Sequence, residues 1–196
     1  MRIGIYSGSF DPVHKGHIGL ATALLQGGYV DEVWMIRSPH NPFKEASDLT
    51  PDHHRLAMLQ AVAAGVSGVE VSDIEDHLPK PSYTISTLDA LHSAYPEHEF
   101  HLIIGADNWL LFPKWREWQR IVNEYHLLVY PRPGYPLSSD VEREYPHVRV
   151  VDADLYDVSS TMIRERCRKG ESISDLVPVE VERYIGEHSL YGTPNG

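Results

Sequence analysis

Short apolar runs alternate along this chain with stretches in which apolar residues recur every three or four positions. The runs are typical of buried strands, and the recurring positions are typical of one face of an amphipathic helix. Strands separated by helices imply right-handed crossovers and a mainly parallel sheet with helices on both faces. The pattern therefore predicts an α/β fold with a doubly wound sheet and a small C-terminal helical part. Strands are expected at 2–6, 31–38, 68–74, 99–105, 126–134 and 147–152.

The starts and stops of the helices can be placed from prolines, glycines and capping residues. Thr50 is expected to be the N-cap of the second helix, with Pro51 at its first helical position. The glycine pair 27–28 ends the first helix, Pro96 ends the third, and Pro113 splits the helical stretch after the fourth strand. The residues expected to face the core from the first three helices are Leu20, Ala21, Leu24, Leu25, Leu56, Leu59, Val62, Ala63, Ile85, Leu88, Leu91 and Tyr95.

Composition limits the number of domains, the expected location of the protein and the kinds of metal site. The chain has 196 residues, of which 42% are hydrophobic and 23% are charged, so we expect one domain over 1–196, with 131–146 as its most mobile loop. No apolar stretch approaches the ~18 residues of a membrane helix, and the first residues lack the apolar core of a secretory signal. We therefore expect a cytoplasmic protein without membrane contact. The single cysteine, Cys167, is expected to be a partly buried, inert thiol, which excludes a cysteine-based zinc site.

The charge balance narrows the class of partner. A formal net charge of −11 argues against broad nucleic-acid binding, which depends on a basic surface, but a local cluster of cations can still hold a small anion. The chain has 12 histidines. Those in polar surroundings without metal-ligand spacing are expected to be solvated, namely His53, His54, His92, His98 and His147.

The segment GSFDPVHKGH at 8–17 directly follows the first strand and leads into the first helix. Ligands of open α/β sheets bind at this edge. Gly8 and Gly16 let backbone approach a phosphate closely, and His14 and His17 can point the same way beside the helix N-terminus, which favours anions. Two alternatives stay open: each histidine could be a capping or packing residue, or the pair could bind zinc, for which Asp11 is the only nearby further ligand.

Two motifs carry a resemblance to a known superfamily. GSFDPVHKGH resembles the G-(T/S)-F-D-P-x-H-x-G-H signature of the nucleotidyltransferases related to class I aminoacyl-tRNA synthetases, in which the two histidines contact the triphosphate of ATP. SSTMIR at 159–164 resembles the I-S-S-T-x-I-R element of the same superfamily. Its hydroxyls and free amides would open a helix facing a phosphate, with Arg164 as a forked donor. Taken alone, this element is better explained as a simple N-cap with a surface arginine, and it is the first motif that favours the phosphate role.

Further stretches are similar to the nicotinate-nucleotide adenylyltransferase family, so that the resemblance spans nearly the whole chain. They are PSYTISTLDAL at 81–91, FHLIIGADNWLLFPKW at 100–115, PRPGYPL at 131–137 and a LVPVEVERYI...SLYG tail. The resemblance implies a Rossmann-like single nucleotidyltransferase domain that joins ATP to nicotinate mononucleotide in NAD biosynthesis. It also implies Mg²⁺ bound through the ATP phosphates.

The resemblance assigns roles residue by residue. Catalytic roles are implied for His14, His17 and Arg164. ATP binding is implied for Gly8, Ser9, Phe10, Gly16, Lys44, Gly105, Asp107, Arg132, Ser159, Ser160 and Thr161. Binding of nicotinate mononucleotide is implied for Tyr83, Thr84, Trp115 and Arg116. Three simpler interpretations compete with these roles: Asp107 as a helix N-cap, Lys44 as a solvated lysine and Trp115 as a core residue.

The chain departs from the family pattern at three positions and leaves two alternative functions open. Ser7 and Ser9 replace a common glycine and threonine, and Arg116 stands where a tyrosine is common. The acceptor could instead be nicotinamide mononucleotide or another small phosphate, although PSYT and FPKW disfavour phosphopantetheine. A catalytically silent nucleotide-sensing module is the alternative from another class. Because the attacking phosphate is already anionic at neutral pH, no general base is expected, and a triphosphate should raise the pKa of a nearby histidine.

Overall fold

The computed structural model describes residues 1–38, 49–154 and 156–192 and contains one six-stranded parallel sheet in the order β3-β2-β1-β4-β5-β6. This confirms the predicted α/β, Rossmann-like fold. The strands are β1 (Arg2–Gly8), β2 (Glu32–Arg37), β3 (Val69–Ser72), β4 (Glu99–Gly105), β5 (His126–Tyr130) and β6 (Val148–Val150).

Helices connect the strands and cover both faces of the sheet. The α-helices are α1 (Lys15–Gln26), α2 (Asp52–Ala63), α3 (Thr84–Ala94), α4 (Ala106–Leu111), α5 (Trp118–Glu124), α6 (Val141–Glu144), α7 (Ser160–Lys169) and α8 (Val179–Glu187). Short 3₁₀ turns are η2 (Ile74–His77), η3 (Phe112–Lys114) and η4 (Leu190–Gly192). None of the helices in the described part of the chain is both long and apolar enough to cross a membrane.

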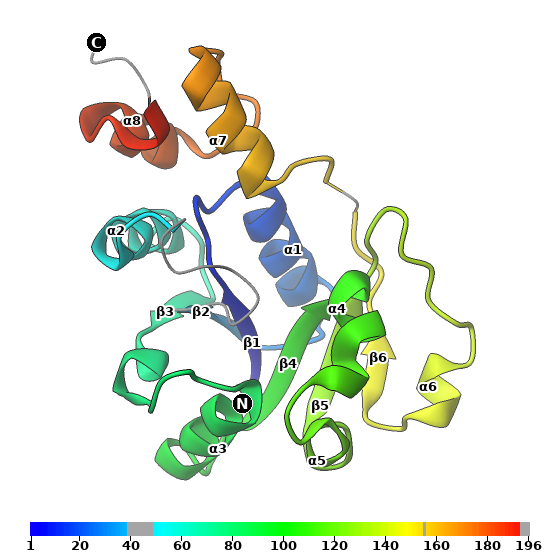
Figure 1. Cartoon of the computed structure of the whole chain (residues 1–196). Helices are drawn as coiled ribbons and strands as arrows, with labels where there is room; N and C mark the ends of the chain where they lie inside the picture. The colour runs from blue at the N-terminus through cyan, green and yellow to red at the C-terminus, as the bar shows by residue number, and fades with distance from the viewer. Residues whose placement is uncertain (39–48, 155, 193–196) are drawn as a thin grey trace.

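The sheet separates two apolar cores because successive side chains of a strand point to opposite faces. Along β4, Ile103 packs into one core, whereas Leu102 and Ile104 pack into the other. Helices α1, α2, α7 and α8 complete the first core, and α3, α5 and α6 complete the second. In Figure 1, α7 and α8 lie together at the top, while α3 and α5 lie near the bottom.

The strand order reverses beside β1, which is bordered by β2 on one side and by β4 on the other. The first three strands extend the sheet in one direction, and the next three extend it in the other. Open α/β sheets bind ligands in the crevice beyond the carboxyl ends of the strands at such a switch. The segment after β1 and the residues after β4 therefore meet where a ligand is expected.

Several local predictions need correction. Pro51, rather than Thr50, is the N-cap of α2, and its carbonyl accepts from the N–H groups of His54 and Arg55. The N–H of Thr50 donates to the Asp11 carboxylate, and the carbonyl of Thr50 accepts from the side chain of Arg55. Leu25 and Leu56 are only half-buried, and Tyr95 is 40% exposed. The remaining helix residues expected in the core are buried, as is Cys167, whose pKa is raised by burial.

The segment 131–146, expected to be a mobile loop, contains the short helix α6. Of the histidines expected to be solvated, His53, His92 and His147 are exposed, while His54 and His98 are half-buried.

Candidate active site

The loop after β1 brings two histidines face to face at the start of α1. His14 is the N-cap of α1 and is 5% exposed, and His17 lies on the first turn. Their rings are stacked with centroids 3.6 Å apart and planes 20° apart. Phe10, which is buried and adopts a positive φ of 46°, packs edge-on against His17 at 5.0 Å. The loop therefore positions both imidazoles through contacts along their edges and faces.

A backbone hydrogen bond determines which nitrogen of His17 can donate. The N–H of His14 donates to Nδ1 of His17 over 3.2 Å. A nitrogen that accepts carries no proton, so the proton of the neutral ring is assigned to Nε2. His17 can thus offer an N–H donor to an anion without being charged. A side chain that binds phosphate needs such a donor. A neutral ring can provide it here without repelling the ring stacked on it.

The protein itself favours the neutral form of both rings. Burial, with the positive charge of Arg132 as a smaller cause, lowers the pKa of His14 to about 4. Burial also lowers the pKa of His17 well below its ordinary value, and His14 and Arg132 add to this effect. From the sequence, we expect a bound triphosphate to raise the pKa of these histidines. Its negative charge would act against the lowering caused by burial. The protein's own surroundings set both rings to be neutral donors at pH 7.

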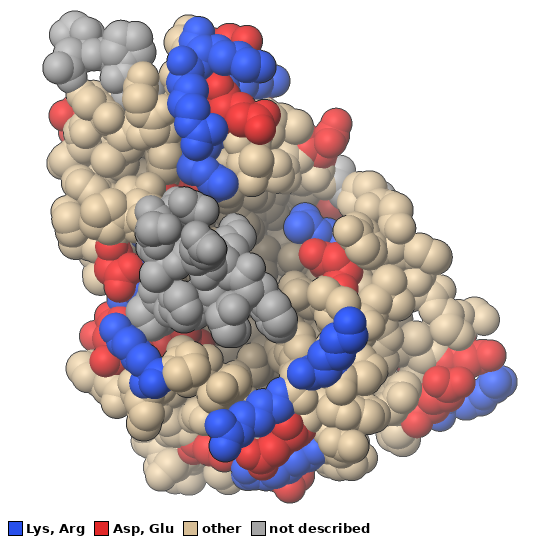
Figure 2. Space-filling model, in the orientation of Figure 1, with Lys and Arg blue, Asp and Glu red and all other residues tan. Residues whose placement is uncertain are grey.

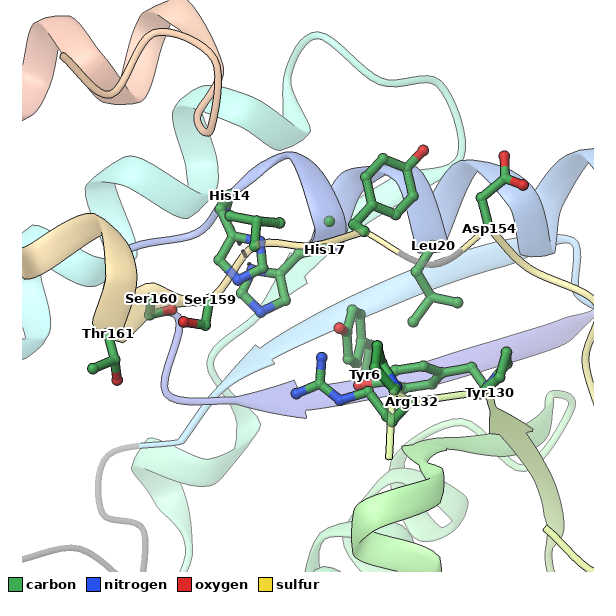
Figure 3. Close-up of a pocket in the computed structure, with 15 residues that line it drawn as sticks. Tyr6, His14, His17, Leu20, Tyr130, Arg132, Asp154, Ser159, Ser160 and Thr161 are labelled. Atoms are coloured by element: carbon green, nitrogen blue, oxygen red, sulfur yellow. Dashed lines mark hydrogen bonds between the residues drawn. The ribbon is translucent and has the colours of Figure 1, made fainter. Parts of the chain in front are cut away.

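The two histidines open onto a cavity of about 260 Å³, which we call the histidine pocket. Figure 3 shows His14, His17 and Ser159–Thr161 on one side of it, with Arg132 extending towards the same gap from the side of β5. The sequence-predicted residues that line it are His14, Gly16, His17, Arg132, Ser159, Ser160 and Thr161. Lining residues that sequence reasoning missed include Tyr6, Tyr130, Asp154 and Tyr156.

Two glycines of α1 allow this close packing. A Cβ on Gly16 would lie 3.0 Å from the side chain of Val158 and 3.2 Å from the ring of His14. A Cβ on Gly19 would lie only 2.2 Å from the hydroxyl of Tyr156. The segment before α7 can therefore pass directly over α1 because neither position carries a side chain.

The SSTMIR element lies at the start of α7. It contacts the segment 9–14 between β1 and α1, which we call the histidine loop. Ser159 caps the helix, with its Oγ accepting from the N–H of Met162 over 3.2 Å. Ser160 Oγ donates to the carbonyl of Pro12 over 2.9 Å, and Arg164 donates to the carbonyl of Asp11 over 2.7 Å. The two sequence motifs are thus joined directly. Ser160 and Arg164 fix the loop that carries the histidines, which an N-cap with a surface arginine would not do.

The carboxyl end of β4 adds a carboxylate close to the pocket. Asp107 lies in the first turn of α4, and its Oδ1 is 3.5 Å from Nε of Arg132. Gly105, rather than Asp107, is the N-cap of α4, which corrects the simpler interpretation of Asp107. A Cβ on Gly105 would lie 2.3 Å from Oδ1 of Asp107, so only glycine leaves room for this carboxylate. Among the described residues, this buried Oδ1 accepts no hydrogen bond.

Arg132 brings a positive charge to the lining of the pocket, although the chain carries a net charge of −11. In Figure 2, Lys and Arg side chains lie above, beside and below the hollow in the middle of this face, with acidic side chains next to several of them. Lys44, which was expected to approach a phosphate, lies outside the described residues. Arg132 can therefore attract an anion locally within an acidic protein.

Known proteins resemble this chain over most of its length. A model of the cytidylyltransferase-like family matches residues 5–166. A probable nicotinate-nucleotide adenylyltransferase of Bacteroides fragilis is 50% identical over 172 residues, which cover 88% of this chain and 85% of that protein. This chain belongs to the nicotinate-nucleotide adenylyltransferase family.

Two further relatives extend the match. The probable nicotinate-nucleotide adenylyltransferase of Bacteroides thetaiotaomicron is 41% identical over 188 residues, which cover 96% of this chain and 92% of the relative. The structure of Plasmodium falciparum nicotinic acid mononucleotide adenylyltransferase complexed with NaAD has a TM-score of 0.83 and covers 100% of this chain and 99% of its own. At 21% identity it supports the fold alone.

The four residues that the adenylyltransferase family implies for the mononucleotide gather at a separate place. They do not line the histidine pocket, and they lie at the start of α3 and between η3 and α5. The guanidinium of Arg116 lies over the ring of Tyr83, 4.7 Å from its centroid. Trp115 is half-buried with its ring 5.3 Å from that of Phe112, so part of it packs on the core. Thr84 is the first residue of α3.

A buried carboxylate supports this second group. Glu75, in η2, is 5% exposed. Its Oε1 accepts from Thr87 Oγ1 over 3.0 Å, and its Oε2 accepts from Ser82 Oγ over 3.3 Å. Burial raises the pKa of Glu75, while hydrogen bonds from Thr87 and Ser82 act against that rise. Glu75 thereby fixes the residues on both sides of Tyr83 and Thr84.

Sequence reasoning also missed Arg55, a residue of α2 that holds the start of the histidine loop. Arg55 is 0% exposed, although it belongs to a polar stretch of the chain. Its Nη1 donates to the carbonyls of Ser9 at 2.6 Å and Ser38 at 3.0 Å, and its Nε donates to the carbonyl of Thr50 at 3.0 Å. It also pairs with Asp52. One side chain therefore holds the ends of the segments that follow β1 and β2.

Asp11 links the same loop to the far end of the chain. Its Oδ2 accepts from the N–H of Thr50 over 3.2 Å, and its Oδ1 accepts from the hydroxyl of Tyr191 over 2.7 Å. Asp11 is 1% exposed. With both oxygens engaged by the protein, Asp11 is an anchor of the loop. It does not serve as the further zinc ligand that a histidine-pair metal site would need.

Proposed function

We propose that this chain transfers the adenylyl group of ATP to nicotinate mononucleotide at the histidine pocket, giving nicotinate adenine dinucleotide and pyrophosphate. The observation that supports this most is the convergence of His14, His17, Arg132 and the start of α7 on one cavity at the carboxyl edge of the sheet. Neutral N–H donors, a guanidinium and a helix N-terminus are together suited to a polyphosphate.

The reaction needs no general base in the protein. A phosphate oxygen of nicotinate mononucleotide attacks the α-phosphorus of ATP and forms a new P–O bond. The bond from the α-phosphorus to the bridging oxygen breaks, and pyrophosphate leaves with the electron pair. The second pKa of a phosphate monoester is about 6, so the nucleophile is already anionic at pH 7. Catalysis then rests on alignment, which can supply ~7 to 11 kcal/mol, and on stabilising the charge that moves to the leaving group.

The roles of the histidine pocket follow from its hydrogen bonds. Nε2–H of His17 donates to the polyphosphate, and Arg132 approaches it from the side of β5. The exposed start of α7, with the Thr161 hydroxyl, provides further donors. Arg164 uses one N–H group on the Asp11 carbonyl and another on Thr161, and since a guanidinium has five, the rest can reach a phosphate. Asp107 is suited to the ribose hydroxyls, because its side chain is 31% exposed and a carboxylate only accepts hydrogen bonds.

We expect Mg²⁺ to accompany ATP. This ion prefers six oxygen ligands and is usually held by one or two carboxylates, substrate phosphates and water. Asp154 supplies an exposed carboxylate among the described residues that line the pocket. Such a donor set fits an ion carried mainly by the phosphates. When bound, the ion supplies neutralisation of the phosphate charge.

The mononucleotide is proposed to bind between the start of α3 and the segment after η3. Its pyridinium ring can stack on Trp115 or Tyr83, an attraction worth ~0.5 to 2 kcal/mol, while Thr84 and Arg116 can donate to its carboxylate or phosphate. We expect Trp115→Ala to raise KM for nicotinate mononucleotide about tenfold with KM for ATP unchanged, because the aromatic face is lost. An unchanged KM for the mononucleotide would assign Trp115 to the core alone.

The deciding experiment compares pyrophosphate release from ATP and Mg²⁺ with three acceptors in parallel: nicotinate mononucleotide, nicotinamide mononucleotide and phosphopantetheine. We expect the highest kcat/KM with nicotinate mononucleotide. A preference for either of the others would overturn the acceptor assignment, and ATP binding without turnover would indicate a nucleotide sensor. The cytoplasmic location and the single domain expected from the sequence stay predictions.

A further inference from the structure

A second cluster of ligating side chains lies at the opposite edge of the sheet from the histidine pocket. Glu99 and His101 are in β4, and His126 is the first residue of β5. His101 and His126 are direct partners across the two strands. Because side chains alternate along a strand, Glu99 and His101 share one face of the sheet. The cluster lies four residues before the carboxyl end of β4 at Gly105, or roughly 13 Å along the strand.

The three side chains converge on one point. Nε2 of His101 is 2.6 Å from Oε1 of Glu99, and Nε2 of His126 is 3.7 Å from the same oxygen. The two imidazoles are stacked, with centroids 4.8 Å apart and planes 17° apart. One ligand atom from each of the three residues lies within 4.8 Å of the others. The two rings therefore present the same nitrogen to a shared carboxylate.

A fourth imidazole borders the cluster. The ring centroid of His147 is 5.1 Å from that of His126. Its backbone is held at this place, because the carbonyl of His147 accepts from the N–H of Leu127 over 2.9 Å. His147 is exposed, so its side chain can turn towards a ligand at little cost.

Burial and charge make the cluster accessible to a cation. His101 is 8% exposed, whereas the side chains of His126 and Glu99 are 42% and 55% exposed, so the cluster has a fixed base and an open side. The nearest positive group on the neighbouring strand is Arg2, which is the register partner of Glu99. Its guanidinium is paired with Asp31 at 2.6 Å, which offsets its charge.

We propose that Glu99, His101 and His126 bind one divalent transition-metal ion such as Zn²⁺, with His147 as a fourth ligand. Imidazole nitrogens with one carboxylate suit Zn²⁺, Ni²⁺ or Cu²⁺, whereas Mg²⁺ prefers oxygen ligands alone. Bond lengths of about 2.0 to 2.2 Å place tetrahedral ligand atoms about 3.3 Å apart, a spacing that lies between the two separations of Glu99 from the imidazoles. The ion would join β4 to β5 and act on stability, at a distance from the reacting phosphates.

The test uses the full chain after treatment with a chelator. Zn²⁺ binding is measured by calorimetry, and Co²⁺ is added as a probe whose visible absorption reports a tetrahedral site. We expect one ion per chain and a rise in Tm with Zn²⁺. Glu99→Gln and His126→Ala should each weaken binding at least tenfold and remove the rise in Tm. Both residues are partly exposed, so the variants should fold, and adenylyl transfer with ATP and Mg²⁺ should match that of the wild type.

A matched control comes from another group of histidines. The rings of His53 and His54 are 4.0 Å apart, and those of His54 and His188 are 5.3 Å apart. The double variant His53→Ala/His188→Ala should bind Zn²⁺ as the wild type does. Absence of saturable binding of one ion per chain would overturn the proposal. So would unchanged binding in Glu99→Gln and His126→Ala, or a loss of binding in the control variant.

Discussion

Two imidazoles stacked 3.6 Å apart would repel each other if both carried a proton. The hydrogen bond from the His14 amide to Nδ1 of His17 avoids that conflict, since it leaves a neutral ring with Nε2–H as the donor. His17 therefore presents an N–H donor without a positive charge, which is what the proposed polyphosphate site requires. At the scale of single residues, hydrogen bonding and burial of this pair decide what the site can do.

We predict that His17→Ala lowers kcat by about 10² to 10³-fold with little change in KM for either substrate, because a donor to the developing charge is lost. The measurement is steady-state pyrophosphate release. His53→Ala, which removes an exposed histidine, should leave kcat unchanged. A wild-type kcat in His17→Ala would remove this residue from the reaction.

The low pKa of His14 has a consequence for stability. Between pH 6.5, its ordinary value, and about 4, its value in the fold, the unfolded chain binds a proton that the folded chain does not. The free energy of unfolding contributed by His14 is therefore fully present above pH 6.5 and is lost as the pH falls towards 4. A difference of this size corresponds to roughly 3 kcal/mol for one group.

We therefore predict that the free energy of unfolding of the wild type falls more steeply between pH 6.5 and 4.5 than that of His14→Gln, by about 2 to 3 kcal/mol over this range. Urea unfolding at a series of pH values measures it, and carboxylates common to both proteins cancel in the comparison. His92→Gln, at an exposed position, should keep the wild-type slope. Parallel slopes for the wild type and His14→Gln would contradict the assignment.

At the scale of elements, α2 fixes the site through one arginine. Arg55 ties this helix to the carbonyls of Ser9, after β1, and Ser38, after β2. These carbonyls lie one residue beyond the ends of β1 and β2, which are neighbouring parallel strands. A forked, permanently charged donor suits several acceptors with different directions, whereas a lysine offers a single point charge.

We predict that Arg55→Met lowers the free energy of unfolding by about 2 to 4 kcal/mol, because buried carbonyls lose their donor. It should also raise KM for ATP, since the loop at Ser9 loses its anchor. Arg55→Lys should lie between the wild type and Arg55→Met. Arg183→Met, which removes a 70% exposed arginine, should change stability by less than about 0.5 kcal/mol. Denaturant unfolding and initial rates measure both effects, and wild-type values for Arg55→Met would refute the anchoring role.

At the scale of the whole molecule, the net charge of −11 and the local cations have separate consequences. Charges farther apart than the Debye length of ~8 Å at physiological salt are largely screened, so a small anion in the pocket responds mainly to its neighbours. A long polyanion would instead meet the acidic surface beyond the pocket.

We predict that tRNA and duplex DNA show no measurable binding at about 0.15 M salt, whereas ATP with Mg²⁺ binds under the same conditions. Fluorescence anisotropy with labelled nucleic acids and calorimetry with ATP are the measurements. Binding of tRNA at micromolar concentration would contradict the expectation drawn from charge.

Particular residues and elements show which parts of the fold and the site could be predicted from the sequence. The run at 99–105 coincides with β4, because a continuous apolar segment has one low-energy place in a parallel sheet. The histidine pair was found because its motif is local. Arg55 could have been suspected from its spacing, since residues 55, 59 and 62 fall on one face of α2. Its acceptors, however, come from other segments, and only the fold brings them together.

The contact between Asp11 and Tyr191 joins residues separated by 180 positions in the chain. A ribosome adds about 5 to 20 residues per second, so roughly 10 to 40 s pass between the synthesis of the two partners. During that interval the segment with Asp11, His14 and His17 has been synthesised, but the hydrogen bond from Tyr191 to Asp11 cannot yet form. A nascent chain should therefore acquire the final form of the loop that carries His14 only after residue 191 has left the exit tunnel.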